Sequence, residues 1–296
     1  MNVTLALGGG GSRGNSHIGV IRRLEKEGFK IKAVAGTSFG GIVAVFYALG
    51  CTPDEIEETF KALNQTQLYG HAPDDGPSLL GLAGVKRWLQ ETLGDKTFKD
   101  LKIPCIVTAT DLNSGREVLI STGSLVEAVL STITLPGIFP ARHIEGMELV
   151  DGGTIDPVPV DAARSLAPKL PVVAVVLTTR IGVPAQSWNI PLPEYLPRLL
   201  VDRIGKMRYA MALDVIMRSL DIVTRAVTHY RLEVDKPEII IRPRVAEIDT
   251  LDVVDVHEVA LRGEEAVEEM LPRIRQYFAW RNRLRRLVGM KTWPVI

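Results

Sequence analysis

The sequence is poor in several features that often identify a protein class directly. It has two cysteines, Cys51 and Cys105, and their separation fits neither a metal site nor a redox pair. The formal net charge is zero, which argues against nucleic acid as the main partner. No apolar run is long enough to cross a bilayer, and the N-terminus lacks the basic start of a signal peptide. We therefore expect a cytoplasmic protein, with peripheral contact to a membrane left open.

Histidine is also scarce, and no histidine has the setting of a catalytic base. An α/β-hydrolase places its serine, acid and histidine in that order along the chain, and His17 comes too early for it. The other four lie in a polar loop, a hairpin and charged helical stretches. We interpret all five as packing or solvated residues: His17, His71, His143, His229 and His257.

The fold class follows from what is present. Strand-like apolar runs at 3–7, 31–35, 103–110 and 172–177 alternate with helical patterns, and a long helical pattern covers about 203–227. Short connections between alternating strands and helices predict a mostly parallel sheet covered on both faces, an α/β fold of three layers. Apolar residues make up 46% of the chain, as in an ordinary globular protein.

The most informative segment is Gly36-Thr37-Ser38-Phe39-Gly40, a G-x-S-x-G sequence between a strand pattern and a helix pattern. This context predicts a nucleophile elbow, a sharp turn that presents the serine hydroxyl above the sheet. The elbow follows the second strand, which is earlier than in ordinary α/β-hydrolases. The motif alone is only moderately specific.

A glycine-rich turn follows the first strand, from Gly8 to Gly14. Its G-x-G-x-x-G spacing also fits dinucleotide binding, but that function expects a carboxylate at the end of the second strand, where Ser38 stands instead. Consecutive glycines before a helix expose backbone N–H groups to an anion. Beside a serine nucleophile, such a loop is an oxyanion hole.

Asp151 is the candidate base. It ends a short strand and precedes Gly152 and Gly153, which permit close approach of neighbouring backbone. An ionised carboxylate within reach of the serine hydroxyl accepts its proton. Taken alone, Asp-Gly-Gly is more typical of a turn.

In order and spacing, these three blocks resemble the signature of the patatin-like phospholipases. Leu135 to Pro140 and Asp156 to Val160 resemble the segments that flank the aspartate in bacterial members. The resemblance implies a patatin-like fold and a lipolytic acyl hydrolase with a Ser–Asp dyad, an acyl-enzyme intermediate, and no metal or cofactor. It assigns Ser38 as nucleophile, Asp151 as base, and the N–H groups of Gly9, Gly10 and Gly11 as the oxyanion hole. The supporting motif residues are Arg13, with a structural or anion-steadying role, and Gly14, Gly36, Gly40, Gly152 and Gly153.

The resemblance covers the catalytic core, residues 1–180, and residues 181–296 are expected to complete a single domain. An acyl pocket needs an apolar wall, for which the candidates are Phe39, Leu135, Ile138 and Phe139, with plain core packing as the alternative. Residues 184–220 are a candidate cap. The basic segment 281–291 fits either a solvated helix, which we favour, or contact with anionic lipid.

Three functions therefore compete. The leading one is hydrolysis of a lipid or other acyl ester, as in a phospholipase A or lysophospholipase. The first alternative is an esterase or thioesterase acting on soluble acyl substrates. The second is a non-catalytic adaptor on the same scaffold. The sequence gives neither the headgroup preference nor the oligomeric state.

Overall fold

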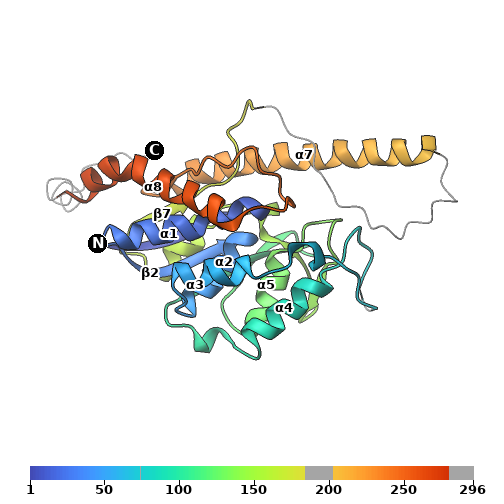
Figure 1. Ribbon diagram of the computed structural model, residues 1–296, viewed down its shortest axis with the longest axis horizontal. Coiled ribbons are helices and arrows are strands. Elements are labelled where there is room, and N and C mark those ends of the chain that lie inside the picture. Colours follow the sequence, from blue (N-terminus) through green and yellow to red (C-terminus); the bar gives the residue numbers. More distant parts are fainter. Residues whose placement is uncertain (74, 184–202, 280–296) are drawn as a thin grey trace.

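A computed structural model describes residues 1–73, 75–183 and 203–279 (Figure 1). In this part of the chain, eight strands form one sheet in the order β5-β6-β3-β2-β1-β7-β8, and β4 also pairs with β3. The strands are β1 (Asn2–Leu7), β2 (Lys30–Thr37), β3 (Cys105–Asp111), β4 (Arg116–Ile120), β5 (Arg142–Ile144), β6 (Met147–Asp151), β7 (Val172–Val175) and β8 (Ile239–Ile241).

The helices are α1 (Ser16–Lys26), α2 (Phe39–Ala48), α3 (Pro53–Lys61), α4 (Ala83–Leu93), α5 (Leu125–Thr132), α6 (Val160–Leu166), α7 (Arg203–Asp235) and α8 (Val256–Phe278). The long helix α7 continues beyond 227, where the sequence pattern had suggested its end, and it crosses one side of the molecule (Figure 1). Within the described ranges, each helix is too short or too polar to span a bilayer.

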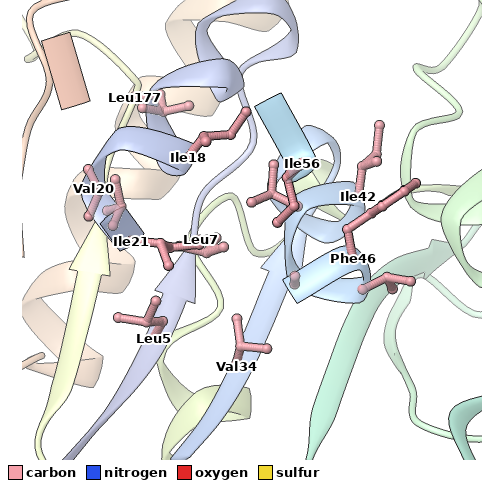
Figure 2. Packing of buried hydrophobic residues seen from close by; sticks show 14 of the residues in the cluster. Leu5, Leu7, Ile18, Val20, Ile21, Val34, Ile42, Phe46, Ile56 and Leu177 are labelled. Carbon is pink, nitrogen blue, oxygen red and sulfur yellow. The ribbon is translucent and has the colours of Figure 1, made fainter. Parts of the chain in front are cut away.

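Alternating residues of each central strand enter two different cores, because successive side chains of a strand point to opposite faces. On one face, Leu5 and Leu7 of β1 pack in a cluster with Ile18 and Ile21 of α1 and with residues of α2 and α8 (Figure 2). On the other face, a cluster containing Ala6 includes residues of α6 and of the C-terminal part of α7. The expected three-layer α/β fold is thus confirmed.

The sheet is parallel in its centre and antiparallel at one end. β1 pairs in parallel with β2 and β7, β2 with β3, and β7 with β8. β3 pairs antiparallel with β4 and β6, and β6 with β5. The carboxyl ends of the parallel strands therefore share one edge, where binding sites of α/β sheets usually lie.

The position of β6 decides what happens at that edge. Thr37, the last residue of β2, pairs with Thr108 of β3, and Asp151, the last residue of β6, pairs with the next residue, Ala109. β4 pairs with β3 along Val107–Asp111, which includes Thr108 and Ala109. At these two residues β4 therefore takes up the other edge of β3. Because a strand has only two edges, β2 and β6 lie end to end along the same edge of β3.

Candidate active site

Ser38 occupies a strained turn between β2 and α2. Its backbone has φ 55° and ψ −129°, a conformation that a residue with a Cβ rarely adopts. A Cβ on Gly36 would lie 2.3 Å from the carbonyl oxygen of Gly40, and a Cβ on Gly40 would lie 2.2 Å from that of Leu7. The Ser38 N–H donates to Oγ1 of Thr132 at 2.7 Å. These contacts hold the turn that the G-x-S-x-G pattern predicts.

Asp151 presents a buried carboxylate at the end of β6. Asp151 is 3% exposed, and its Oδ1 accepts a hydrogen bond from the N–H of Gly153 at 2.7 Å. Oδ2 has no partner of ordinary hydrogen-bond geometry among the described residues. Burial raises the pKa of Asp151 to about 6, while hydrogen bonding from Ser38 and Gly153 opposes the rise. The carboxyl group is therefore poised to gain or lose a proton near neutral pH.

The end-to-end strands bring Ser38 and Asp151 together. Ser38 directly follows Thr37, and the partners of Thr37 and Asp151 on β3 are adjacent residues. The Ser38 side chain is close enough to lower the pKa of the Asp151 carboxyl group. In unliganded sites, such catalytic hydrogen bonds are often long and poorly aligned.

The glycine loop lies beside Ser38. A Cβ on Gly9 would lie 3.1 Å from the Ser38 Cβ. The N–H of Gly9, however, donates to the Pro157 carbonyl at 2.9 Å, so its expected role as a free oxyanion donor needs correction. No such bond from the N–H of Gly10 or Gly11 occurs within the described residues. The oxyanion assignment therefore narrows to Gly10 and Gly11.

Arg13 fastens this loop to a distant segment. Arg13 is 8% exposed, and its Nε donates a hydrogen bond to the carbonyl of Ile248. Burial lowers the pKa of Arg13, and Asp221 and Asp249 oppose that change. Of the two roles considered for Arg13, these contacts favour the structural one.

Three motif glycines allow tight packing around the site. A Cβ on Gly14 would lie 2.2 Å from Cδ1 of Phe39, and one on Gly152 would lie 2.2 Å from Oγ1 of Thr108. A Cβ on Gly153 would meet Oδ1 of Asp151 at 3.1 Å. The glycines therefore let the elbow, β3 and the aspartate turn approach one another.

His17 supports the loop and is unsuited to be a base. It is fully buried, and its Nε2 lies 2.8 Å from the Gly8 carbonyl oxygen. Burial lowers the pKa of His17 to about 4, so the ring is neutral at physiological pH. His257 Nδ1 lies 2.7 Å from the Glu57 carboxylate, and His229 Nε2 lies 3.3 Å from the Glu233 carboxylate.

A cavity of about 400 Å³ opens beside Ser38 and the glycine loop. Phe39, Leu135 and Phe139, three of the four expected wall residues, line it. Ile138, the fourth, is not among the lining residues and packs in the core, the alternative given for these side chains. Further apolar lining comes from helices α2, α3 and α4 and neighbouring loops, and includes Ile42, Phe60, Leu68, Tyr69, Val85 and Trp88.

Some site residues were not anticipated from the sequence. Thr132 of α5 holds the Ser38 N–H, and Asp156 contacts Arg231 of α7. Asp156 stands in the segment after the aspartate turn that the resemblance had marked, but nothing in the pattern indicated its partner. Of the candidate cap, 184–220, residues 184–202 lie outside the described residues and 203–220 belong to α7, while the basic segment 281–291 lies entirely outside them.

A family model for patatin-like phospholipases matches residues 5–164. This match spans more than half of the chain, and it includes the elbow, the glycine loop and the aspartate turn. The chain belongs to the patatin-like phospholipase family.

Individual relatives agree with this membership. An uncharacterized NTE family protein of Mycobacterium tuberculosis is 35% identical over 161 residues, covering 53% of this chain and 44% of the relative. Patatin-like phospholipase domain-containing protein 6 of Homo sapiens is 32% identical over 174 residues, covering 56% and 13%. Lysophospholipase NTE1 of Mycosarcoma maydis is 34% identical over 172 residues, covering 54% and 9%. The chain thus spans less than half the length of these curated relatives.

Among solved structures, VipD from Legionella pneumophila has a similar fold. The TM-score is 0.56 at 13% sequence identity, covering 90% of this chain and 66% of VipD. At this identity the likeness concerns the fold alone.

Proposed function

We propose that the chain is a lipolytic acyl hydrolase in which Ser38 is the nucleophile and Asp151 the general base. The observation that carries the proposal is the end-to-end arrangement of β2 and β6 along one edge of β3. It places a strained serine next to a buried carboxylate, beside an apolar cavity. Family membership and the lysophospholipase name of one relative support a lipid ester as substrate.

The proposed reaction has two steps. Ser38 Oγ attacks the ester carbonyl carbon while its proton passes to Asp151, and the N–H groups of Gly10 and Gly11 stabilise the oxyanion. The C–O bond to the alcohol then breaks, and the alcohol leaves with the proton from Asp151. In the second step a water molecule gives a proton to Asp151 and attacks the acyl carbon. The bond from that carbon to Ser38 Oγ then breaks, Asp151 returns the proton to Oγ, and the fatty acid is released.

The cavity favours an acyl chain over a small polar acyl group. Its lining is aromatic and aliphatic on the side of α3 and α4, where Phe39 and Phe60 form an edge-to-face pair and Phe60 forms another with Trp88. Polar groups of Ser12, Asn15 and Asp252 line the side of the glycine loop. An ester with its chain in the apolar part would present its carbonyl to Ser38.

Peripheral contact with a lipid surface is part of the proposal. The outward side chains of α7 include Met211, Val215, Ile222 and Val223, each at least 54% exposed. Charged residues of the same stretch pair with each other at i and i+4, Asp214 with Arg218 and Asp221 with Arg225. Asp221 and the cavity-lining Asp252 both act on Arg13, so this part of α7 passes near the cavity. An apolar strip there fits the interface of a bilayer that holds the substrate.

A fluorophosphonate probe tests the catalytic part of the proposal. The wild-type chain is expected to be labelled and to release fatty acid from phospholipids, lysophospholipids or glycerides, and Ser38→Ala to lose both activities. Release from acyl-thioesters or soluble esters alone would favour the first alternative. Absence of labelling in the wild-type chain would contradict the proposal and favour a non-catalytic adaptor.

The acyl-chain assignment has its own test. Val85→Phe replaces an isopropyl group in the wall of the cavity with a larger aromatic ring. It is expected to lower kcat/KM for long-chain esters about tenfold relative to short-chain esters. The short-chain ester serves as the internal control for folding and chemistry. An unchanged ratio of long-chain to short-chain kcat/KM would show that the chain lies elsewhere.

Sedimentation with vesicles of phosphatidylcholine tests the lipid contact. Ile222→Glu is expected to reduce the bound fraction, while Gln90→Glu, which adds the same charge on exposed α4, leaves it unchanged. Unchanged binding of Ile222→Glu, or a dimer in solution that this variant dissociates, would contradict lipid contact and indicate a protein interface instead.

A further inference from the structure

Asp156 and Pro157 form a backbone junction of the site. The Oγ1 of Thr37, next to the nucleophile, donates to the Asp156 carbonyl at 2.9 Å. The N–H of Gly9, in the glycine loop, donates to the Pro157 carbonyl at 2.9 Å. The N–H of Asp156 donates to the carbonyl of Gly152, in the aspartate turn, at 2.8 Å. The three segments that supply nucleophile, oxyanion donors and base therefore all bind two consecutive residues.

The side chain of Asp156 is held from outside this junction. Asp156 is fully buried, and its Oδ2 accepts a hydrogen bond from Nη2 of Arg231 in α7 at 2.8 Å. Oδ1 has no partner among the described residues. Burial and the neighbouring Glu117 carboxyl group raise the pKa of Asp156, and the Arg231 guanidinium opposes the rise.

Arg231 is the cation of an otherwise acidic cluster. Its guanidinium also lies 3.3 Å from the Asp235 carboxylate and 4.0 Å from that of Glu117 in β4. Asp161 of α6 adds negative potential at Glu117 and Asp235, and Arg164 of α6 offsets part of it at Asp235. Without Arg231, the Asp156 carboxylate would face Glu117 with no counterion of its own and would have to take up a proton or move.

We propose that Arg231 is a positioning residue for acyl transfer, which acts through Asp156 to keep the three segments in register. The proposal rests on the function proposed above. A displacement of about 1 Å at a reacting group can lower the rate of reaction on the order of 10²-fold, so a junction that fixes three segments affects turnover more than substrate binding. A purely structural ion pair would instead change stability and leave the rates unchanged.

The main variants are Arg231→Met and Arg231→Lys, with Arg164→Met as the matched control. Arg164 also tethers the C-terminal end of α7, through Glu238 at 2.7 Å and the carbonyls of Asp235 and Lys236 at 3.1 Å, but these bonds do not include Asp156. For each variant we would measure the rate of fluorophosphonate labelling at Ser38, kcat and KM with a short-chain ester, and Tm.

We expect Arg231→Met to lower kcat and the labelling rate by about 10- to 100-fold with KM changed less than about twofold. Arg231→Lys keeps the charge but loses the planar fork, so it should recover part of the rate. Arg164→Met should stay within about twofold of the wild-type rates. Combining Asp156→Asn with Arg231→Met should add little to the loss from Arg231→Met, because both changes remove one interaction.

Equal rates in Arg231→Met and Arg164→Met would overturn the inference, whatever happens to Tm. If Arg231→Met does not fold, Arg231→Lys takes its place as the test. The inference would be overturned if folded Arg231→Lys has wild-type rates and if the losses are additive when Arg231→Lys is combined with Asp156→Asn. A wild-type chain that the probe does not label would contradict the proposed function instead, so the two failures are distinguishable.

Discussion

Two buried aspartates in one short segment, Asp151 and Asp156, have opposite surroundings. Asp151 meets the N–H of Gly153 and the hydroxyl of Ser38, and no cation pairs with it among the described residues. Asp156 meets the guanidinium of Arg231. Burial raises the pKa of both carboxyl groups.

This difference in surroundings suits Asp151 to act as a base and Asp156 to hold the neighbouring backbone in position. A buried carboxylate without a counterion binds a proton readily, which is what proton transfer from a hydroxyl requires. A buried carboxylate with a guanidinium partner is held in one position by a charge-assisted hydrogen bond and so fixes geometry. The predictions that follow test whether this division is correct.

The largest expected effect is on turnover. Asp151→Asn should lower kcat by about 10²- to 10⁴-fold, because the amide cannot accept the serine proton. Asp156→Asn keeps an oxygen that can accept from Arg231 and should lower kcat only about tenfold. Steady-state kinetics on both variants measure the contrast. Near-normal activity of Asp151→Asn, or equal losses in the two variants, would remove the distinction.

The pH profile should give the next largest effect. Ser38 needs Asp151 as the carboxylate, and burial raises the pKa of Asp151 to about 6. We therefore expect kcat/KM to be at its plateau above that pH and to fall about tenfold per pH unit below it. Measurement with a neutral short-chain ester, with Tm followed at each pH, separates titration from unfolding. An acid limb at about 4, the ordinary range for aspartate, would show that another group controls the reaction.

Stability should show the smallest effect. The pKa of Asp151 is higher in the folded chain than the ordinary value, so stability falls as pH rises through the window between about 4 and 6. Asp151→Asn removes that loss and should raise the free energy of unfolding at pH 8 by about 1–3 kcal/mol. The pKa of Asp156 is raised as well, so Asp156→Asn removes a similar loss, but it also weakens the bond to Arg231 and should therefore raise the free energy of unfolding less than Asp151→Asn does. Denaturant unfolding at that pH measures both, and an equal or larger gain from Asp156→Asn would contradict the contrast.

The parts of the site that the sequence predicted are those with local causes. The G-x-S-x-G turn needs glycines next to Ser38, and a run of glycines between strand and helix exposes N–H groups, so both can be identified from neighbouring residues. Asp151 became a candidate only through its company in the family pattern.

The parts that the sequence did not predict depend on contacts between distant segments. The N–H of Gly9 is bonded to the Pro157 carbonyl because the loop after β1 and the segment after β6 meet at the sheet edge. No local sequence pattern encodes this contact. Phe139 lines the cavity and its neighbour Ile138 does not, and an irregular loop has no periodicity from which this difference could be predicted. Arg231 is one of many charged residues on a long helix, and its importance depends on which of them faces Asp156.

The abutting ends of β2 and β6 also limit how the protein can change its length. The distance between the Ser38 hydroxyl and the Asp151 carboxylate depends on β3, because the ends of β2 and β6 pair with its adjacent residues Thr108 and Ala109. One residue added to the end of β2 or β6 would have no free pairing position on β3, and it would push the two groups apart or past each other. The stretch between α2 and β3, which includes α3 and α4, is free of this restriction, so insertions there can reshape the substrate cavity while the chemistry stays in place.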